Sequence, residues 1–137
     1  MKVKEYLSQA YRLDKRINSK LDQIASLSEL ATKCTSTLSG MPRDTNHGSS
    51  KVADAVVKII DLQAEINRDI DRLVDLKREL VKVIKAVDNT EHQLLLELRY
   101  LCFKTWEQIA VEMGYDVRHI YRLHQQALSD VTAPLPN

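Results

Sequence analysis

Glycine and proline are scarce in this chain, with three residues of each among 137. Most sheet architectures need such residues at the turns between strands, so their scarcity favours a helical fold. No stretch approaches the roughly 18 apolar residues of a membrane helix, and the first residues lack the apolar segment of a secretory signal. The sequence therefore predicts an all-α protein of the cytoplasm that does not enter a membrane.

An excess of charge of one sign is also missing, because 20 basic residues are balanced by 19 acidic ones. This excludes a strongly basic coat for nucleic acid but allows a local basic patch. Cys34 and Cys102 lack metal-site spacing, and we expect both to be buried, reduced thiols. The chain has no glycine-rich phosphate loop, no paired-carboxylate signature and no nucleophile with a visible base. We therefore predict no enzyme activity, no cofactor and no metal site.

Two long segments without helix breakers lie on either side of residues 39–50, whose composition is that of a loop. We predict helices over residues 3–38 and 51–88, so that residues 1–88 form a long antiparallel helical hairpin. The first helix has apolar residues three and four apart: Val3, Leu7, Ala10, Leu13, Ile17, Leu21, Ile24, Leu27, Ala31, Cys34 and Leu38. The second follows a heptad pattern that only Asp69 interrupts: Ile59, Leu62, Ile66, Asp69, Leu73, Leu76, Leu80, Val83 and Val87.

The second helix carries more apolar surface than one partner helix can cover. The additional residues are Val56, Ile60, Ile70, Val74, Val81 and Ile84. Either a second copy of the chain or the C-terminal part covers them, and a homodimer is the solution we expect.

Residues 89–131 are predicted to form a compact module of three short helices, followed by a flexible tail over 132–137. The first helix begins with a capping box at Thr90 and Gln93 and turns Leu94, Leu95, Leu98, Leu101 and Cys102 inward. A second capping box, Thr105 with Gln108, begins a helix over 106–113 that stops at Gly114. Asp116 is the predicted N-cap of the third helix, over 117–128.

The second and third of these helices have the pattern of a helix-turn-helix. A small Ala110 allows close approach of the neighbouring helix, and Gly114 supplies the positive φ of a sharp turn. The predicted core is Trp106, Ile109, Ala110, Met113, Gly114, Ile120 and Leu123.

One face of the third helix suits DNA recognition. Its candidate DNA-binding residues are Arg118, Tyr121, Arg122 and Gln125, with His119 at the border of the face. Arginine bonds guanine or phosphate, glutamine pairs with adenine, and tyrosine reaches phosphate or a thymine methyl group. The alternative is a solvated face in a module used only for protein contacts. His119 and His124 lack a third ligand and are interpreted as polar or packing residues, not metal ligands.

The module's charge limits how well it binds DNA unaided. From Asn89 onward four basic residues (Arg99, Lys104, Arg118 and Arg122) stand against six acidic ones (Glu91, Glu97, Glu107, Glu112, Asp116 and Asp130), a net charge of −2. We expect weak non-specific binding by one copy, and useful affinity only with a second copy or a polymerase partner.

The segments 95–101, 105–110 and 121–124 resemble a family of small phage and prophage proteins of Gram-positive bacteria. These are grouped with late-gene and autolysin-regulator-type transcriptional activators, and their C-terminal part is similar to the promoter-binding region four of sigma factors. The resemblance implies a transcription regulator that binds double-stranded DNA in the host bacterial cytoplasm, with RNA polymerase as a partner. The competing hypothesis is a helical interaction protein that binds a host protein without reading DNA.

Overall fold

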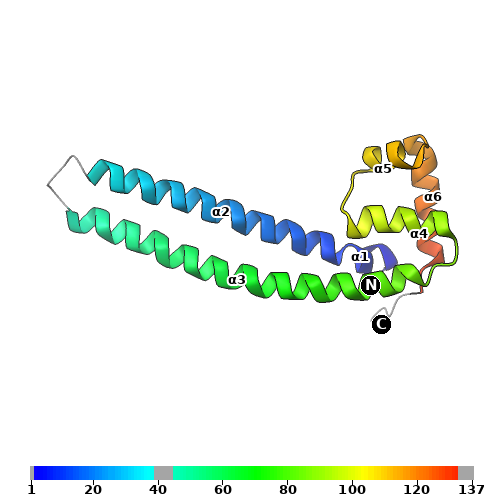
Figure 1. Cartoon of the computed structure of the whole chain (residues 1–137), viewed down its shortest axis with the longest axis horizontal. Helices are drawn as coiled ribbons and strands as arrows, with labels where there is room; N and C mark the ends of the chain where they lie inside the picture. Colours follow the sequence, from blue (N-terminus) through cyan, green and yellow to red (C-terminus); the bar gives the residue numbers. More distant parts are fainter. Residues whose placement is uncertain (1, 39–44, 133–137) are drawn as a thin grey trace. The chain divides into compact units, whose positions relative to one another are not determined.

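In a computed structural model of the chain, which describes residues 2–38 and 45–132, all regular elements of the described residues are helical, as predicted (Figure 1). The elements are α1 (Val3–Leu7), α2 (Gln9–Leu38), α3 (Thr45–Lys85), α4 (Thr90–Leu96), the π-helical turn η1 (Glu97–Leu101), α5 (Trp106–Met113) and α6 (Val117–Asp130). The described residues divide into two compact units, one of residues 2–14 and 72–132 and one of residues 15–38 and 45–71. No helix of these residues is long and apolar enough to cross a membrane.

The two long helices differ from their predicted bounds. A turn at Ser8 separates α1 from α2, and the Ser8 hydroxyl donates to the Lys4 carbonyl oxygen at 2.7 Å. α3 begins at Thr45, so the second half of the predicted 39–50 loop is helical, while residues 39–44 lie outside the described residues. A glycine such as Gly48 destabilises a helix by about 1 kcal/mol relative to alanine, which is too little to end a helix that continues for many turns. Thr132 is non-helical, and the rest of the predicted tail is likewise outside the described residues.

In the unit of residues 15–71, α2 and α3 run antiparallel and share an apolar seam (Figure 1). Ile17, Leu62 and Ile66 are buried in it. Asp69, the polar interruption of the heptad pattern, is also buried, and its Oδ2 atom lies 2.6 Å from Lys20 Nζ. Lys20, not Leu21, therefore occupies the inward position, and Leu21 is 48% exposed, contrary to prediction. Each charge of this ion pair offsets part of the hydration that the other loses on burial.

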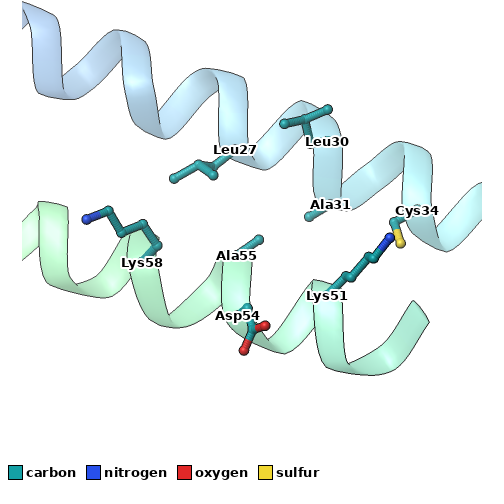
Figure 2. A pocket seen from close by; sticks show the side chains of 8 residues that line it. All are labelled: Leu27, Leu30, Ala31, Cys34, Lys51, Asp54, Ala55 and Lys58. Carbon is teal, nitrogen blue, oxygen red and sulfur yellow. The ribbon is translucent and has the colours of Figure 1, made fainter. Parts of the chain in front are cut away.

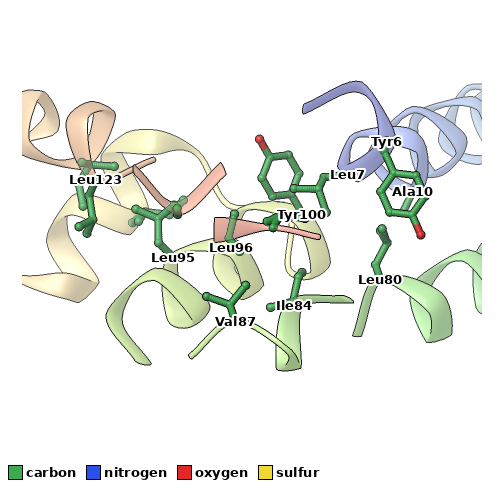
Figure 3. Close-up of a cluster of buried hydrophobic side chains, with 14 of the residues drawn as sticks. Tyr6, Leu7, Ala10, Leu80, Ile84, Val87, Leu95, Leu96, Tyr100 and Leu123 are labelled. Carbon is green, nitrogen blue, oxygen red and sulfur yellow. The ribbon is translucent and has the colours of Figure 1, made fainter. Parts of the chain in front are cut away.

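The other unit is built around a core to which the N-terminal segment contributes (Figure 3). Leu7 and Ala10 are fully buried together with Leu80 and Ile84 of α3 and with side chains of the C-terminal helices. The remaining core residues are Tyr6, Val87, Leu95, Leu96, Tyr100, Ile109, Ala110, Ile120, Leu123, Ala127 and Val131. Residues 1–88 were assigned to a hairpin by sequence, whereas both ends of that hairpin belong to the compact unit of the C-terminal helices.

The additional apolar residues of α3 have two different environments. Ile84 is 0% exposed in the core just described, and Val81 is half-buried. Val56, Ile60, Ile70 and Val74 are 43–57% exposed, so nothing in the described chain covers them fully. The C-terminal helices thus explain only the last part of the predicted apolar belt.

Candidate nucleic-acid interface

Local hydrogen bonds set the bounds of α5 and the start of α6 as the sequence predicted, whereas α6 ends at Asp130, two residues later than predicted. The Gln108 backbone N–H donates to Thr105 Oγ1 at 3.2 Å, and the Thr105 N–H donates to Gln108 Oε1 at 2.9 Å. α5 ends at Gly114, whose φ of 74° lies in the left-handed region. The Asp116 carboxylate accepts from the His119 backbone N–H at 2.7 Å and caps α6. These bonds orient the two helices around a short turn.

The predicted core of the helix pair is mostly buried. Ile109 and Ile120 are 0% exposed, Ala110 is 5% exposed and Leu123 is 6% exposed. The other predicted members are half-buried (Trp106 and Met113) or, for Gly114, exposed at the turn. Tyr115, which follows the turn glycine, is 39% exposed, and its hydroxyl donates to the Glu91 carboxylate.

The opposite face of α6 is exposed and polar. Arg118, Tyr121, Arg122 and Gln125 all have exposed side chains there. Within the described residues, neither Arg118 nor Arg122 forms an ion pair with a carboxylate, so both guanidinium groups remain available to an external partner. His119 is half-buried, with its ring 4.3 Å from that of Tyr115. The structure therefore brings the four predicted groove-facing residues onto one face and places His119 beside it.

A chain of aromatic rings connects this face to the core. The Trp106 ring meets Tyr121 and His124 edge-on, at centroid distances of 5.5 and 4.6 Å. On its other side the Arg99 guanidinium lies 4.2 Å from the Trp106 ring centroid, a cation–π contact. Trp106 thus positions Tyr121, an exposed member of the α6 face, against η1.

His124 ends this chain as a buried, neutral imidazole. Its Nε2 atom lies 2.6 Å from the Tyr100 hydroxyl oxygen. Burial, helped by the nearby charges of Lys4 and Arg99, lowers the pKa of His124 to about 4, and burial raises the pKa of Tyr100 to about 12. At neutral pH the phenol therefore keeps its proton and the imidazole is neutral, and the two groups share a hydrogen bond. No local sequence pattern predicts this role, because it depends on residues that are distant in the sequence.

The first helix of the predicted module differs from the prediction in three respects. Its N-cap is Asn89, one residue before Thr90, and the Asn89 side chain accepts from the Glu91 and His92 backbone N–H groups. Leu96 is buried instead of Leu94, which is 44% exposed. The π-helical turn η1 then adds a residue to one turn and changes the direction of the side chains after it.

His92 and the two cysteines have environments that the sequence analysis did not predict. Cys102 is exposed and Cys34 is half-buried, so neither is the buried thiol expected, and the two are not joined by a disulfide bond. His92 is 8% exposed, and its Nδ1 atom lies 2.5 Å from Asp130 Oδ2, which joins the start of α4 to the end of α6. Among the described residues, no three His, Cys, Asp or Glu side chains are grouped so that they could hold a metal ion.

The exposed face of α5 has the opposite charge from that of α6. Val111 is 83% exposed, and Glu107, Gln108 and Glu112 surround it in a shallow hollow. The Glu112 carboxylate also pairs with Lys104. A face of this composition repels phosphate and would instead fit a protein surface with basic and apolar groups.

The unit of residues 15–71 contains a separate apolar pocket between α2 and α3 (Figure 2). Its volume is about 450 Å³, and its apolar lining comes from Leu27, Leu30, Ala31, Cys34 and Ala55. Lys51, Asp54 and Lys58 complete the lining on the α3 side. No catalytic group combination is visible among these side chains.

Fold and surface together define an all-α protein in which a helical hairpin is combined with C-terminal helices that present an exposed basic and polar face. The chain belongs to the family described as "Protein of unknown function (DUF1492)", which matches residues 39–132. A comparison with curated proteins and one with solved structures found no match to the chain.

Proposed function

We propose that this protein is a DNA-binding transcription regulator that reads promoter DNA with α6. The observation that carries the proposal is the contrast between the two faces of this helix. One face is buried against α4 and α5, while Arg118, Tyr121, Arg122 and Gln125 lie together on the other. Arginine and glutamine offer the bidentate hydrogen bonds by which base edges are discriminated in a major groove.

The geometry of the preceding turn supports a helix-turn-helix motif. A capped α5, a left-handed glycine and a capped α6 are the parts from which such a motif is built. Ala110, at 5% exposure, permits the close helix crossing that the motif requires. This geometry and the resemblance of the sequence to sigma-factor region four support the proposal of a phage-type regulator in a bacterial cytoplasm.

RNA polymerase and a second copy of the chain are the proposed protein partners. The segment from Asn89 onward carries a net charge of −2, which argues for additional contacts beyond those of one α6. The exposed apolar residues of α3, among them Val56 and Ile60, offer a surface for self-association. A dimer would present two copies of α6 to two half-sites.

Substitution of the two arginines tests the proposal directly. Arg118→Ala and Arg122→Ala should each weaken binding to promoter DNA by about 1–3 kcal/mol where a bidentate base contact is lost. Fluorescence anisotropy would measure this with promoter-region and unrelated DNA at two salt concentrations, with and without RNA polymerase. Arg72→Ala is the matched control, because Arg72 is an exposed arginine of α3 in the same compact unit.

Gly114→Val is the control for the motif itself. The residue has φ 74°, which a β-branched side chain adopts only with strain, so this variant should lose DNA binding through distortion of the turn. If the double variant Arg118→Ala/Arg122→Ala binds promoter DNA and regulates transcription as the wild type does, α6 does not read the groove.

A second candidate function is protein binding without DNA recognition, and the α5 surface favours it. An apolar side chain as exposed as Val111, between Glu107 and Glu112, is better matched to a protein than to a nucleic acid. Val111→Asp would then abolish regulation, whereas Arg118→Ala and Arg122→Ala would leave it unchanged.

A further inference from the structure

A small recess in the compact unit of the C-terminal helices brings together two cations from opposite ends of the sequence. Its lining comes from α1, the start of α2, the Ser8 turn and η1: Lys4, Ser8, Tyr11, Arg99 and Tyr100. The volume is about 40 Å³, which provides room for about three water-sized atoms. A nucleobase is too large for such a space, whereas the two non-bridging oxygen atoms of one backbone phosphate fit it.

Lys4 and Arg99 make the recess electropositive. No acidic residue lines it, and within the described chain neither cation forms an ion pair with a carboxylate. Both charges also act on the neighbouring His124, whose pKa they help to lower. Lys4 and Arg99 are therefore close enough to His124 for their charges to act on its ring.

The Arg99 side chain is held in place before any ligand arrives. Its Nη1 group donates to the Lys104 carbonyl oxygen at 3.0 Å, and the guanidinium rests on the Trp106 ring. An arginine has five N–H donors, so this single bond leaves others for an anion. Lys4 is exposed on α1, and the Ser8 and Tyr100 hydroxyl groups are already hydrogen-bonded within the protein. The two cations are therefore the groups that would bind the anion.

The position of the recess relates it to the α6 face. Trp106 lies between Arg99 and Tyr121, so a single ring separates the cation from an exposed residue of that face. DNA that contacts Tyr121 would bring its backbone close to Arg99, and Lys4 would supply the positive charge that the segment from Asn89 onward lacks.

We propose that the Lys4–Arg99 recess binds a phosphate group of the DNA backbone beside the groove that α6 enters. This inference rests on the proposed function and adds the N-terminal segment to the DNA interface. Such a contact fixes the position of the protein on the duplex and contributes affinity that does not depend on sequence.

Lys4→Gln is the decisive variant, because Lys4 is exposed and its loss should leave the core intact. It should weaken binding to promoter and unrelated DNA by the same factor, and reduce the slope of log affinity against log salt by about one unit. Arg12→Gln is the matched control: it removes one exposed positive charge from the same N-terminal segment, outside the recess lining, and should keep the wild-type slope. Arg99→Lys keeps the charge but not the planar donors, and should give an intermediate loss.

A titration with inorganic phosphate provides the second measurement. Trp106 is the only tryptophan of the chain and contacts Arg99, so its fluorescence should respond to phosphate but not to chloride at equal ionic strength, and Lys4→Gln should lose the response. A phosphate response together with a wild-type DNA slope in Lys4→Gln would overturn the backbone contact in favour of a site for free phosphate. The recess is not an anion site if Lys4→Gln binds DNA with the wild-type salt slope and the wild-type fluorescence does not respond to phosphate. If the wild-type protein binds no DNA, the proposed function fails first, and the backbone contact fails with it.

Discussion

Acidification from pH 7 to pH 4 should destabilise the protein through His124. The imidazole is neutral in the folded state because burial, with the charges of Lys4 and Arg99, lowers its pKa from 6.5 to about 4. Above pH 6.5 both the folded and the unfolded state hold it neutral, so its titration has no effect on stability there. As the pH falls below 6.5, the unfolded chain binds a proton that the folded chain does not accept until about pH 4.

The loss can be estimated from the difference between these two pKa values. At about 1.4 kcal/mol for each pKa unit, the free energy of unfolding should fall by roughly 3 kcal/mol between pH 6.5 and pH 4 because of this residue alone. That is a large part of the roughly 5–15 kcal/mol that stabilises a typical domain.

Urea denaturation at a series of pH values, followed by Trp106 fluorescence, measures the effect. His124→Gln removes the titrating group while its side-chain carbonyl can still accept from the Tyr100 hydroxyl. This variant should be less stable at pH 7, since it loses the ring contact with Trp106, but should lose less stability on acidification.

His119→Gln is the matched control, because His119 is on the same helix but only half-buried. It should retain the wild-type loss of stability on acidification, since it keeps the buried His124. The reasoning is refuted if His124→Gln loses as much stability as the wild type between pH 6.5 and pH 4, or if NMR shows the wild-type His124 ring protonating near pH 6.5.

Two further predictions concern the hairpin. Lys20→Met should destabilise the protein by about 3 kcal/mol, because it leaves the Asp69 carboxylate buried and unpaired. The double variant Lys20→Met/Asp69→Leu should recover most of this loss. Thermal unfolding followed by circular dichroism measures both effects, and equal stability of the wild type and Lys20→Met would contradict the prediction. Self-association through α3 should disappear in Val56→Asp/Ile60→Asp without loss of helix content, because both side chains are exposed in the single chain. Sedimentation at micromolar concentration distinguishes the states, and a monomeric wild type would remove the basis for a dimer.

Several elements of the fold were predictable because their signals are local. The bounds of α5 follow from the Thr105–Gln108 capping box and from Gly114, and the start of α6 follows from Asp116; each involves groups within a few residues of one another. Local signals also failed where two neighbours competed. Asn89 and Thr90 are both good N-cap residues, and only the backbone geometry selects Asn89.

The α6 face was predictable from helical periodicity, but its surroundings were not. The spacing of Arg118, Tyr121, Arg122 and Gln125 places them on one face of any regular helix. The ring chain behind that face joins η1, α5 and α6. No short-range pattern connects Tyr100 with His124, so a histidine that sequence reasoning treated as a polar or packing residue is a buried, neutral part of the core.

The sequence by itself determined that the chain is helical, where α5 begins and ends, where α6 begins, and which residues α6 exposes, since each depends on hydrogen bonds and spacing within a few turns. Only the tertiary structure decided that Lys20 turns inward to Asp69 while Leu21 remains exposed. It also decided that Leu7 and Ala10 pack in the same core as Leu95 and Leu96. Burial of apolar area is not directional, so many pairings of these helices satisfy the same periodic pattern. The observed pairing depends on the shapes and charges of side chains that lie far apart in the sequence.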